Sequence, residues 1–491
     1  MLDINRNTGM SQGEAAIGGS PRERLRVAVL VEHNIVYRHF IKSAAFATLA
    51  QKHDVVFVVP EKGPNNKRLT VDLEPSEVGA PVERIAINTA RLYQQRRLFQ
   101  VSQLIWRPGP EWKHLRALVR HMLGPRASRL YTVLGLPGIF QLFQRWSEAQ
   151  MTREASAMDA FVERFRPDVL IHPTVLDGVF INDFVLLGRK YRIPTIAIMN
   201  SWDNPSTKRA VVGRPDWLLV WGPQTQNHAV RFMGMPPSRA VPFGAAQFDI
   251  YRQAPRVTRD EFCRRHGVDP SKRILLYAGS SKGADEYGHL CMIDEAIERG
   301  VLSNVAVIYR PHPWGHGGYK GERLLDGAWR HVVIENSMRA YLEGVRAGTK
   351  GAYLADYVDT HDVLSSIDAL VSPLSTIILE AMMHGKPALC FLAEQQEGAS
   401  FNLQKELVHF EDMFADPSIL KANGESELIN TLALLMEKAG EPQIETELRS
   451  ACGHFVSTFD RSYRERLCDF VEEVAVEARQ IGHSDKGRRS L

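Results

Sequence analysis

Short runs of apolar residues alternate with amphipathic stretches along most of the chain. Near the start, Arg26–Asn34, Asp54–Pro60 and Val82–Asn88 are predicted to contain strands, with helical sequence between them. An unbroken apolar run is typical of a parallel strand that helices cover on both faces. Strand, helix and strand in this order predict βαβ units with right-handed crossovers.

The same alternation continues through the rest of the chain. Further strands are predicted at Asp168–Thr174, Pro194–Asn200, Asp216–Gly222, Arg239–Gly244, Arg273–Ser281, Val305–Pro313, His331–Asn336, Asp368–Thr376 and Pro387–Leu392. Helices are predicted at Gly178–Tyr191, Thr258–Gly267 and Ser462–Ile481. The pattern predicts an α/β protein with two doubly wound, Rossmann-like domains that face a cleft. Ligands of such domains bind beyond the carboxyl ends of the strands, so the cleft is the expected site.

Changes in composition divide the chain into parts. Residues 1–21 are polar and are expected to be disordered. Residues 22–245 form the predicted N-terminal domain, which contains a helical insertion at 91–150. Residues 246–455 form the C-terminal domain, and 456–491 form a helix and tail. The start lacks the apolar core of a signal peptide, and no apolar run approaches the roughly 18 residues that span a bilayer. We therefore expect a cytoplasmic protein.

Composition adds few constraints. Hydrophobic residues make up 44% of the 491 residues and charged residues 24%, which is ordinary for a globular protein. The cysteines are far apart and form no CxxC pair, which disfavours structural zinc and fits a reducing compartment. They are Cys263, Cys291, Cys390, Cys452 and Cys468.

The charge is unevenly distributed. Residues 91–130 hold nine Lys or Arg and one acid, Glu111, a net charge of +8, interleaved with Trp106 and Trp112. One hypothesis is that this segment faces the anionic inner membrane or an anionic glycan. The alternative is a solvated helical insertion with scattered arginines. No nucleic-acid-binding module is recognisable, so no nucleic-acid partner is expected.

Two loops at predicted strand ends in the second half carry groups that suit a phosphate. In the first, Gly279, Ser280 and Ser281 allow backbone amides and hydroxyls to approach a ligand closely. The loop lacks the Walker A pattern, which disfavours ATP hydrolysis of that kind. In the second, prolines stiffen the segment around Arg310 and His312, which can donate hydrogen bonds to phosphate oxygens.

A third loop runs from a strand into a helix. Ser372, Ser375 and Thr376 stand at the turn, where Ser375 or Thr376 can cap the helix beside an anion site. Glu380 follows about one turn later, where a carboxylate can accept hydrogen bonds from a ribose diol.

A fourth loop lies at the domain junction. Gly244 there permits a close turn, and Asp249 is a candidate helix cap. A structural role is favoured for both residues.

The order of these motifs resembles a known group of enzymes. RPHP, followed further along by SPLST and LEAMMHGKP, is similar to the C-terminal half of GT-B nucleotide-sugar glycosyltransferases. The similarity is to CDP-glycerol glycerophosphotransferase-like proteins, to bacterial sialyl- and Kdo-transferases with an HP motif, and more distantly to UDP-N-acetylglucosamine 2-epimerases. It covers about Val241–Leu392, whereas the first half agrees only in its alternation of strands and helices.

The resemblance implies roles for particular residues. In those families the HP histidine and the Ser/Thr cluster contact the nucleotide phosphates, and the glutamate lies near the ribose. The matching residues are His312, Ser375, Thr376 and Glu380. A Pro-Leu pair after Ser372 departs from the double-Ser form, so the donor stays open among CDP-, CMP- and UDP-linked compounds. No DxD pair occurs in these loops, and we expect no obligatory metal and no other cofactor.

Transfer to a hydroxyl needs a general base within hydrogen-bonding reach. The candidates are Asp177, then His33, then Asp203, each in a loop after a predicted strand of the first half. Trp202 is a candidate platform for a sugar ring, and the WDN sequence beside it resembles the CDP-glycerol-transferase-like group. Each acid or histidine could instead be a helix cap.

The leading hypothesis is transfer of a sugar or glycerophosphoryl unit from a nucleotide-activated donor to a surface polysaccharide or lipid-linked acceptor. The N-terminal domain would hold the acceptor and the C-terminal domain the donor. The alternatives are an enzyme similar to UDP-N-acetylglucosamine 2-epimerase and a non-catalytic scaffold in polysaccharide assembly.

Overall fold

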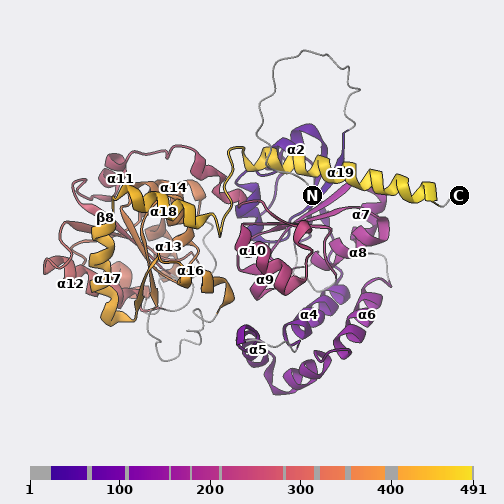
Figure 1. Cartoon of the computed structure of the whole chain (residues 1–491), viewed down its shortest axis with the longest axis horizontal. Coiled ribbons are helices and arrows are strands. Elements are labelled where there is room, and N and C mark those ends of the chain that lie inside the picture. Colours follow the sequence, from indigo (N-terminus) through magenta and orange to yellow (C-terminus); the bar gives the residue numbers. More distant parts are fainter. Residues whose placement is uncertain are drawn as a thin grey trace, which may run out of the picture.

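The computed structural model describes most of the chain as two α/β domains (Figure 1). The described residues are 24–62, 69–105, 110–153, 156–176, 178, 180–208, 213–279, 284–313, 321–348, 355–392 and 407–488.

The N-terminal domain is built on a parallel sheet with the order β3-β2-β1-β4-β5-β6-β7. Its strands are β1 (Arg26–Leu30), β2 (Asp54–Pro60), β3 (Val82–Ile85), β4 (Val169–Thr174), β5 (Thr195–Met199), β6 (Trp217–Val220) and β7 (Ala240–Pro242). Its helices are α1 (Asn34–Val36), the π-helix η1 (Tyr37–Ile41), α2 (Ala47–Lys52), α3 (Pro75–Val78), α4 (Thr89–Gln103), α5 (Pro110–Leu134), α6 (Ile139–Met151), α7 (Ala157–Phe165), α8 (Ile181–Tyr191), α9 (Asn204–Thr207) and α10 (Pro223–His228).

The C-terminal domain has a second parallel sheet with the order β10-β9-β8-β11-β12-β13. Its strands are β8 (Arg273–Ala278), β9 (Val305–Arg310), β10 (Val332–Ile334), β11 (Ala369–Pro373), β12 (Ala388–Leu392) and β13 (Leu420–Asn423). Its helices are α11 (Arg259–His266), α12 (Glu286–Glu298), α13 (Asn336–Arg346), α14 (Tyr357–Ser366), α15 (Ile377–Met383), α16 (Glu411–Ala415), α17 (Glu425–Lys438) and α18 (Pro442–Cys452). The predicted α/β class with two doubly wound domains is therefore confirmed.

Every strand predicted from the apolar runs is present, but several end before the polar residues at the predicted end. β1 ends at Leu30 and β8 ends at Ala278, so the polar residues after them are loop residues. The sequence prediction missed β13, Leu420–Asn423, because this short edge strand is half polar and leaves no apolar run.

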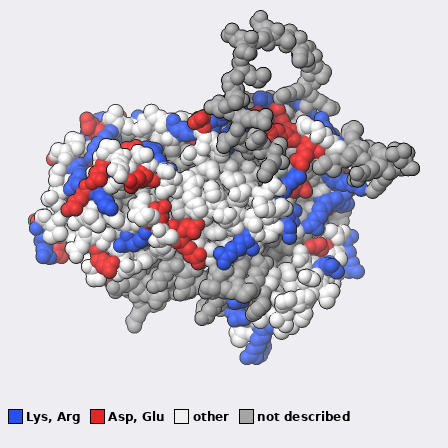
Figure 2. Space-filling model, viewed as in Figure 1, with Lys and Arg blue, Asp and Glu red and all other residues white. Residues whose placement is uncertain are grey.

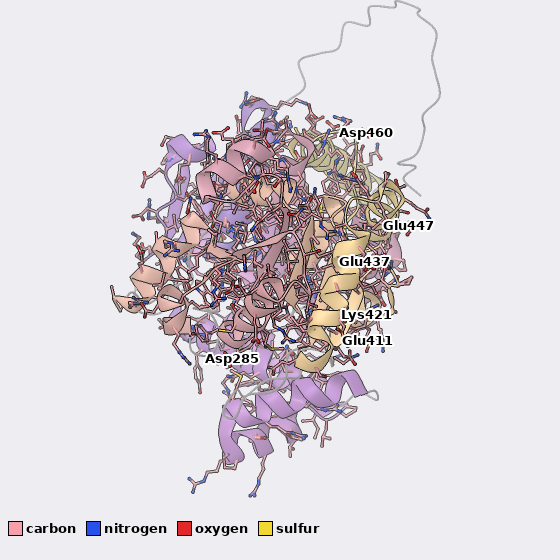
Figure 3. All side chains as sticks on the ribbon, turned by 90° about the vertical axis from the view of Figure 1, so that its left-hand side faces the viewer. Asp285, Glu411, Lys421, Glu437, Glu447 and Asp460 are labelled. Atoms are coloured by element: carbon pink, nitrogen blue, oxygen red, sulfur yellow. The ribbon has the colours of Figure 1, made fainter. Side chains whose placement is uncertain are left out.

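The two strand orders fix where a ligand can bind. The chain reverses direction across the sheet between β1 and β4 in one domain and between β8 and β11 in the other. All strands are parallel, so the loops after β8, β9 and β11 share one edge. In Figure 3, Asp285, in the loop between β8 and α12, lies toward the end of the molecule where the insertion helices are. Asp460 lies toward the opposite end.

The chain crosses between the domains twice. The first crossing is the 3-10 helix η4 (Ala246–Arg252), and the second leads from α18 into α19 (Tyr463–Arg488). At the second crossing Ser457 N donates to Trp221 O at 2.8 Å. Gly244 has φ +75°, and a Cβ there would lie 2.6 Å from Ser457 O, so the close crossing requires glycine.

α19 belongs to the N-terminal domain, although it comes last in the sequence (Figure 1). Leu467, Val471 and Val474 are buried in the same core as the β1 residues Val27 and Val29. The sequence pattern treated this segment as a separate helix and tail, because an amphipathic stripe does not reveal which domain it covers.

The insertion after β3 forms α4, α5 and α6, which project from one side of the N-terminal sheet (Figure 1). Its first helix is anchored in the domain rather than exposed. Arg91 is buried, its Nε donates to Met151 O at 2.7 Å, and its Nη1 lies 3.3 Å from Asp183. The predicted basic segment 91–130 is thus not a single surface. No helix among the described residues is long and apolar enough to cross a bilayer.

Candidate functional site

The carboxyl edge of the C-terminal sheet begins with the loop after β8. Gly279 N donates to Arg310 O at 2.9 Å, which joins this loop to the end of β9. A Cβ on Gly279 would lie 2.3 Å from the Glu286 carboxylate, so a glycine is needed for close packing. Glu286 is itself buried and accepts a hydrogen bond from Tyr309 Oη at 2.5 Å. Ser280 and Ser281 lie outside the described residues.

Arg310, at the end of β9, has an incomplete set of partners. Its side chain is only 6% exposed. Nη2 donates to Thr360 Oγ1 at 3.0 Å, whereas the buried Nη1 has no hydrogen-bond partner among the described residues. A buried guanidinium with an unused N–H is costly unless a ligand supplies an acceptor.

Two glutamates lie close enough to Arg310 for charge interaction, but each is committed elsewhere. Burial would raise the pKa of Glu335, yet hydrogen bonds from His266 and Ser337 and the Arg310 charge lower it to about 2. Glu335 caps α13 through Ser337 N and Met338 N. The missing partner of Arg310 is thus not supplied by this carboxylate.

The second glutamate, Glu380, lies on α15 and is buried. Its carboxylate accepts a hydrogen bond from Tyr251 Oη. Burial raises the pKa of Glu380, against the lowering effect of the Tyr251 hydrogen bond and of the Arg38 and Arg310 charges. Glu380 therefore lies at the domain junction, with Tyr251, Arg38 and Arg310 around it.

The remaining donor-side candidates occupy different positions along the same edge. His312 is half-buried directly after β9. Ser372 is fully buried inside β11, and its hydroxyl donates to Pro373 O at 2.7 Å. Ser375 and Thr376 are half-buried after β11. β8 lies between β9 and β11, so two strand spacings, about 10 Å, separate the two loops.

Thr376 occupies the cap position of α15, but its side chain makes no capping bond. Its Oγ1 instead accepts a hydrogen bond from Trp202 Nε1 of the N-terminal domain at 3.2 Å. Trp202 is 1% exposed and packs against Phe410 and Phe455. The prediction that Trp202 is a platform for a sugar ring is therefore wrong, because the ring is buried in the contact between domains.

A second contact between domains lies beside Arg310 and Glu380. Arg38 Nε donates to Ala355 O at 2.5 Å, and its guanidinium lies 4.2 Å from the centre of the Tyr357 ring. Tyr357 Oη donates to His39 Nε2 at 2.9 Å, because His39 Nδ1 donates to Asn200 O. Burial lowers the pKa of His39 to about 3, so this histidine is neutral and can keep both bonds.

The edge of the N-terminal sheet carries the candidate bases. His33 caps α1, and its Nδ1 accepts from Ile35 N at 3.0 Å, which leaves the proton of a neutral ring on Nε2. Asp177 lies outside the described residues. Close to it in the sequence, Phe180 N donates to Glu32 at 2.8 Å, and Glu32 also accepts from His172 Nε2 at 2.9 Å.

Asp203, the third candidate, occupies the cap position of the short helix α9 at the domain contact, but its side chain makes no capping bond. Its Oδ2 accepts from Thr207 Oγ1 at 3.1 Å. Burial would raise the pKa of Asp203, but the His409 and Lys208 charges and hydrogen bonds from Ser201 and Thr207 lower it. His409 is neutral at pH 7, because burial lowers its pKa to about 4.

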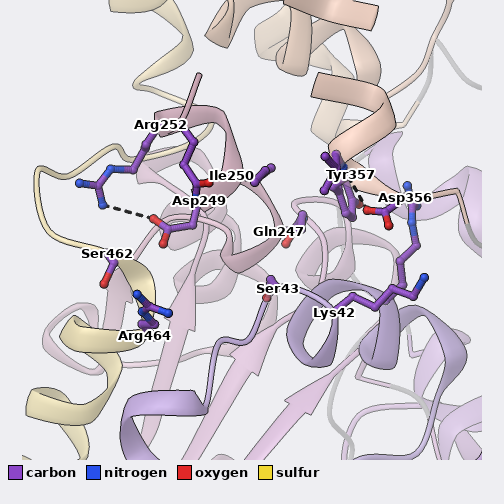
Figure 4. A pocket seen from close by; sticks show the side chains of 13 residues that line it. Lys42, Ser43, Gln247, Asp249, Ile250, Arg252, Asp356, Tyr357, Ser462 and Arg464 are labelled. Atoms are coloured by element: carbon purple, nitrogen blue, oxygen red, sulfur yellow. Dashed lines mark hydrogen bonds and ion pairs between the residues drawn. The ribbon is translucent and has the colours of Figure 1, made fainter. Parts of the chain in front are cut away.

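A cavity of 330 Å³ lies where the chain crosses between the domains (Figure 4). We call it the hinge pocket. It is lined by Arg38, Lys42, Ser43, Gln247, Asp249, Ile250, Arg252, Gln253, Asp356, Tyr357, Val358, Ser462 and Arg464. The sequence suggested Asp249 as a cap of the helix that follows it, but the cap of α11 is Thr258. Asp249 instead accepts a hydrogen bond from Tyr463 N at 3.2 Å, at the start of α19.

Among the described residues, one group of potential metal ligands comes together outside the cleft. His53, Cys468 and Glu472 meet where α19 packs on the N-terminal domain. His53 Nδ1 accepts from Leu25 N at 3.4 Å, so in the neutral ring Nε2 holds the proton and can donate to Glu472 at 3.2 Å. These hydrogen bonds account for the group without a metal.

Sequence reasoning did not identify Arg38, Tyr251, Glu286 or Tyr357. Arg38 and Tyr357 lie in helical segments without a motif, and they meet only because the two domains face each other. Glu286 had a usable signal, since it is an acid next to a candidate phosphate loop.

Comparisons with known proteins support the fold. No protein-family model matches the chain, and no curated protein matches it in sequence. A solved structure described as a UDP-N-acetylglucosamine 2-epimerase from Listeria monocytogenes has a TM-score of 0.50 at 10% identity, over 92% of this chain and 96% of that chain.

Two further solved structures are less similar. The wall teichoic acid polymerase TagF has a TM-score of 0.43 at 10% identity, over 93% of this chain and 90% of that chain. HepE from Anabaena, in complex with UDP, has a TM-score of 0.42 at 11% identity, over 92% and 100%. Together with the two facing parallel sheets, the similarity to the Listeria structure identifies the fold as GT-B.

Proposed function

We propose that this chain is a transferase that moves a sugar or glycerophosphoryl unit from a nucleotide-activated donor to an acceptor hydroxyl. The observation that carries the proposal is Arg310, a buried arginine at the carboxyl end of β9, next to the switch-point strand β8, with an unused Nη1. A donor diphosphate is a fitting partner, since a guanidinium binds two phosphate oxygens at once. The Listeria enzyme of the same fold acts on a nucleotide-diphosphate sugar by its name.

The other donor-side groups complete the proposed site. Arg310 and His312 hold the phosphates from the β9 end, and the hydroxyls of Ser375 and Thr376 do so from the β11 end. Thr376 accepts from Trp202, which leaves its own O–H free to donate. Glu380 holds the ribose through the oxygen that Tyr251 does not use. Gly279 supports the end of β9 through its bond to Arg310 O, and Ser372 supports β11 from inside. Ser280 and Ser281 remain candidates for the phosphate.

The acceptor lies on the side of the N-terminal domain. We propose Asp177 as the general base, with His33 and Asp203 as the next candidates. Asp203 is ionised at neutral pH, as a base must be, but its carboxylate is held by Thr207. His33 can accept a proton on Nε2 only in the tautomer that carries its proton on Nδ1. That tautomer loses the bond from Ile35 N that caps α1. Domain closure then excludes water, which would otherwise hydrolyse the donor.

A nucleotide-release assay tests the proposed function. The full chain is incubated with CDP-, CMP- and UDP-linked donors, with acceptor glycan or lipid-linked acceptor, and free nucleotide is measured. Acceptor-dependent release that disappears in Arg310→Met supports a transferase. Isomerisation of the sugar without release would favour the epimerase, and a failure to bind any nucleotide would favour a scaffold.

The same assay tests whether a metal is required. We propose that the cationic groups at the β9 end stabilise the leaving phosphate without a bound divalent ion. Release should then proceed at an unchanged rate in excess EDTA. A rate that collapses in EDTA and returns with Mg²⁺ would reject this part of the proposal.

We also propose that the acceptor is met at the inner membrane. Seven of the eleven large hydrophobic side chains exposed among the described residues lie between Met122 and Trp146 of the insertion. Leu142 is 67% exposed, and Arg126, Arg129 and Arg145 are exposed near it in the sequence. The lower part of Figure 2, where these helices lie, shows blue and white surface. Arginines beside exposed apolar side chains suit an anionic lipid surface.

Vesicle flotation tests this surface. The native chain should float with phosphatidylglycerol vesicles and not with neutral phosphatidylcholine vesicles. Leu142→Gln with Trp146→Gln should weaken binding about tenfold, and Leu434→Gln, a similarly exposed position on α17, should leave it unchanged. Equal loss in both variants, or self-association through the insertion instead of lipid binding, would exclude a membrane surface.

A further inference from the structure

The hinge pocket is built from segments of both domains and from both chain crossings. Arg38 and Lys42 come from η1 of the N-terminal domain, and Tyr357 comes from α14 of the C-terminal domain. Gln247 lies on the first crossing, and Arg464 follows the second. A molecule bound here would contact every segment that sets how the two domains meet.

The most informative residue of the hinge pocket is Gln247. Its side chain lines the cavity but is 1% exposed. Neither Nε2 nor Oε1 has a hydrogen-bond partner among the described residues. The amides of Gln103 and Asn182 are also unpaired, but neither residue lines this cavity. Gln247 does, so its amide is placed to meet a ligand that offers both an acceptor and a donor. In Figure 4, Gln247 lies between Lys42 on one side and Arg464 on the other.

The charge of the hinge pocket favours an anion. Four cations line it, and its two carboxylates are both engaged. Asp249 accepts from Tyr463 N and pairs with Arg252, while Asp356 caps α14 through Val358 N at 3.0 Å. Within the described chain, Lys42 and Arg464 form no ion pair.

We propose that the hinge pocket binds a small phosphate monoester that carries a hydroxyl group. Lys42 and Arg464 hold the phosphate from opposite sides, and the Gln247 amide pairs with the hydroxyl and a phosphate oxygen. The volume of 330 Å³ is at the small end for such ligands. Binding rests on this pocket alone, whereas its effect on transfer rests on the proposed function.

The hinge pocket is physically connected to the proposed donor site. Tyr251, on the same crossing as Gln247, donates to Glu380. Arg38 and Tyr357 both line the cavity. The Arg38 charge lowers the pKa of Glu380, and Tyr357 donates to His39 at the domain contact. A bound phosphate would therefore favour the arrangement in which these contacts are made.

Calorimetric titration of the full chain tests the proposal, with glycerol 3-phosphate as the probe and inorganic phosphate and glycerol as separate arms. Glycerol 3-phosphate should bind more tightly than either arm, and equally well in Arg310→Met and with excess UDP or CDP. Lys42→Gln and Arg464→Gln should each weaken binding about tenfold. Arg461→Gln, whose arginine pairs with Asp469 outside the pocket, should not.

Gln247→Leu separates a ligand-binding amide from a structural one. Leucine has a similar volume and removes two unpaired polar atoms, so the melting temperature should stay or rise while glycerol 3-phosphate binding weakens about tenfold. Normal binding in this variant would overturn the proposal. So would binding that disappears in Arg310→Met, because the probe would then occupy the donor site.

Two arms of the transfer assay distinguish the source of the phosphate. If the phosphate belongs to the acceptor, glycerol 3-phosphate should raise the KM for acceptor. If it is a free metabolite that acts as an effector, donor affinity should change while the acceptor KM stays constant. If no donor supports transfer but the titrations behave as expected, the proposed function fails and the hinge pocket remains a binding site.

Discussion

Arg91 and Arg310 are both buried arginines near the carboxyl edge of a parallel sheet, yet their surroundings differ. Arg91 has Asp183 at 3.3 Å and Asp159 at 3.6 Å, and Lys190 balances the second carboxylate at 2.8 Å. Arg310 has one hydrogen bond to a neutral hydroxyl and no ion pair among the described residues, although Nη1 lacks a hydrogen-bond partner in both arginines.

The difference separates a scaffold from a candidate site. Around Arg91 the charges are nearly balanced within the protein, which ties the insertion to α7 and α8. Near Arg310, Glu335 is held by Ser337 and Glu380 is held by Tyr251. Neither glutamate bonds to Nη1 of Arg310, which can therefore still bind an acceptor atom of a ligand. A buried charge with paired neighbours stabilises the fold, whereas a buried charge without them indicates a ligand.

The largest effect is expected from breaking the scaffold. Arg91→Met leaves Asp159 and Asp183 with less counter-charge in the interior, so the free energy of unfolding should fall by about 3–5 kcal/mol. Urea denaturation measures this fall. The nucleotide affinity of the folded fraction should stay unchanged. If the variant is as stable as the native chain, Arg91 does not stabilise the fold and the contrast with Arg310 is wrong.

Arg310→Met should have the opposite profile. Nucleotide affinity should fall about a hundredfold, because a charge-assisted contact in a buried site is lost. The melting temperature should stay or rise, since an incompletely paired buried charge is removed. Titration with UDP and CDP measures the nucleotide affinity, and a melting curve measures the melting temperature. Destabilisation as large as that of Arg91→Met would mean that Arg310 is another scaffold residue.

Asp183 gives the scaffold a pH dependence. Burial raises its pKa to about 7, despite the opposing Arg91 charge. The folded chain then binds more protons than the unfolded chain between about pH 4 and about pH 7, so the unfolding free energy decreases as pH rises through that window, by up to about 1.4 kcal/mol per unit. In Asp183→Asn this contribution should disappear. Identical pH profiles for both chains would show that Asp183 stays ionised.

The smallest effect is expected at Glu32, which is buried with His172 and Phe180 N as partners. Glu32→Gln keeps one acceptor for Phe180 N and can donate to the other tautomer of His172. The loss of stability should therefore be about 1 kcal/mol. The KM for acceptor should not change if Glu32 only holds the loop. A large change in KM with normal stability would instead place Glu32 in the acceptor site.

Much of the fold followed from local pattern. Buried parallel strands need unbroken apolar runs, so twelve of the thirteen strands in the described part of the chain could be found from the sequence. β13 could not, because a short edge strand such as Leu420–Asn423 does not need such a run. The positions of Gly279, Arg310 and Glu380 at strand ends or early in a helix were also visible in the sequence.

The partners of those residues were not visible. Trp202 looked like an exposed platform and is buried against the C-terminal domain, and Asp249 looked like a local cap and holds the start of α19. Arg91 belonged to a basic segment that read as one surface, and it is buried.

Local sequence by itself determined the alternation of strands and helices, the two domains and the polar loops at the strand ends. Only the tertiary structure decided which polar groups are satisfied inside the protein and which are left for a ligand. The physical reason is range. An apolar run or a turn is set by neighbours in the sequence, whereas the partner of a buried charge can come from any segment that folding brings within a few ångströms.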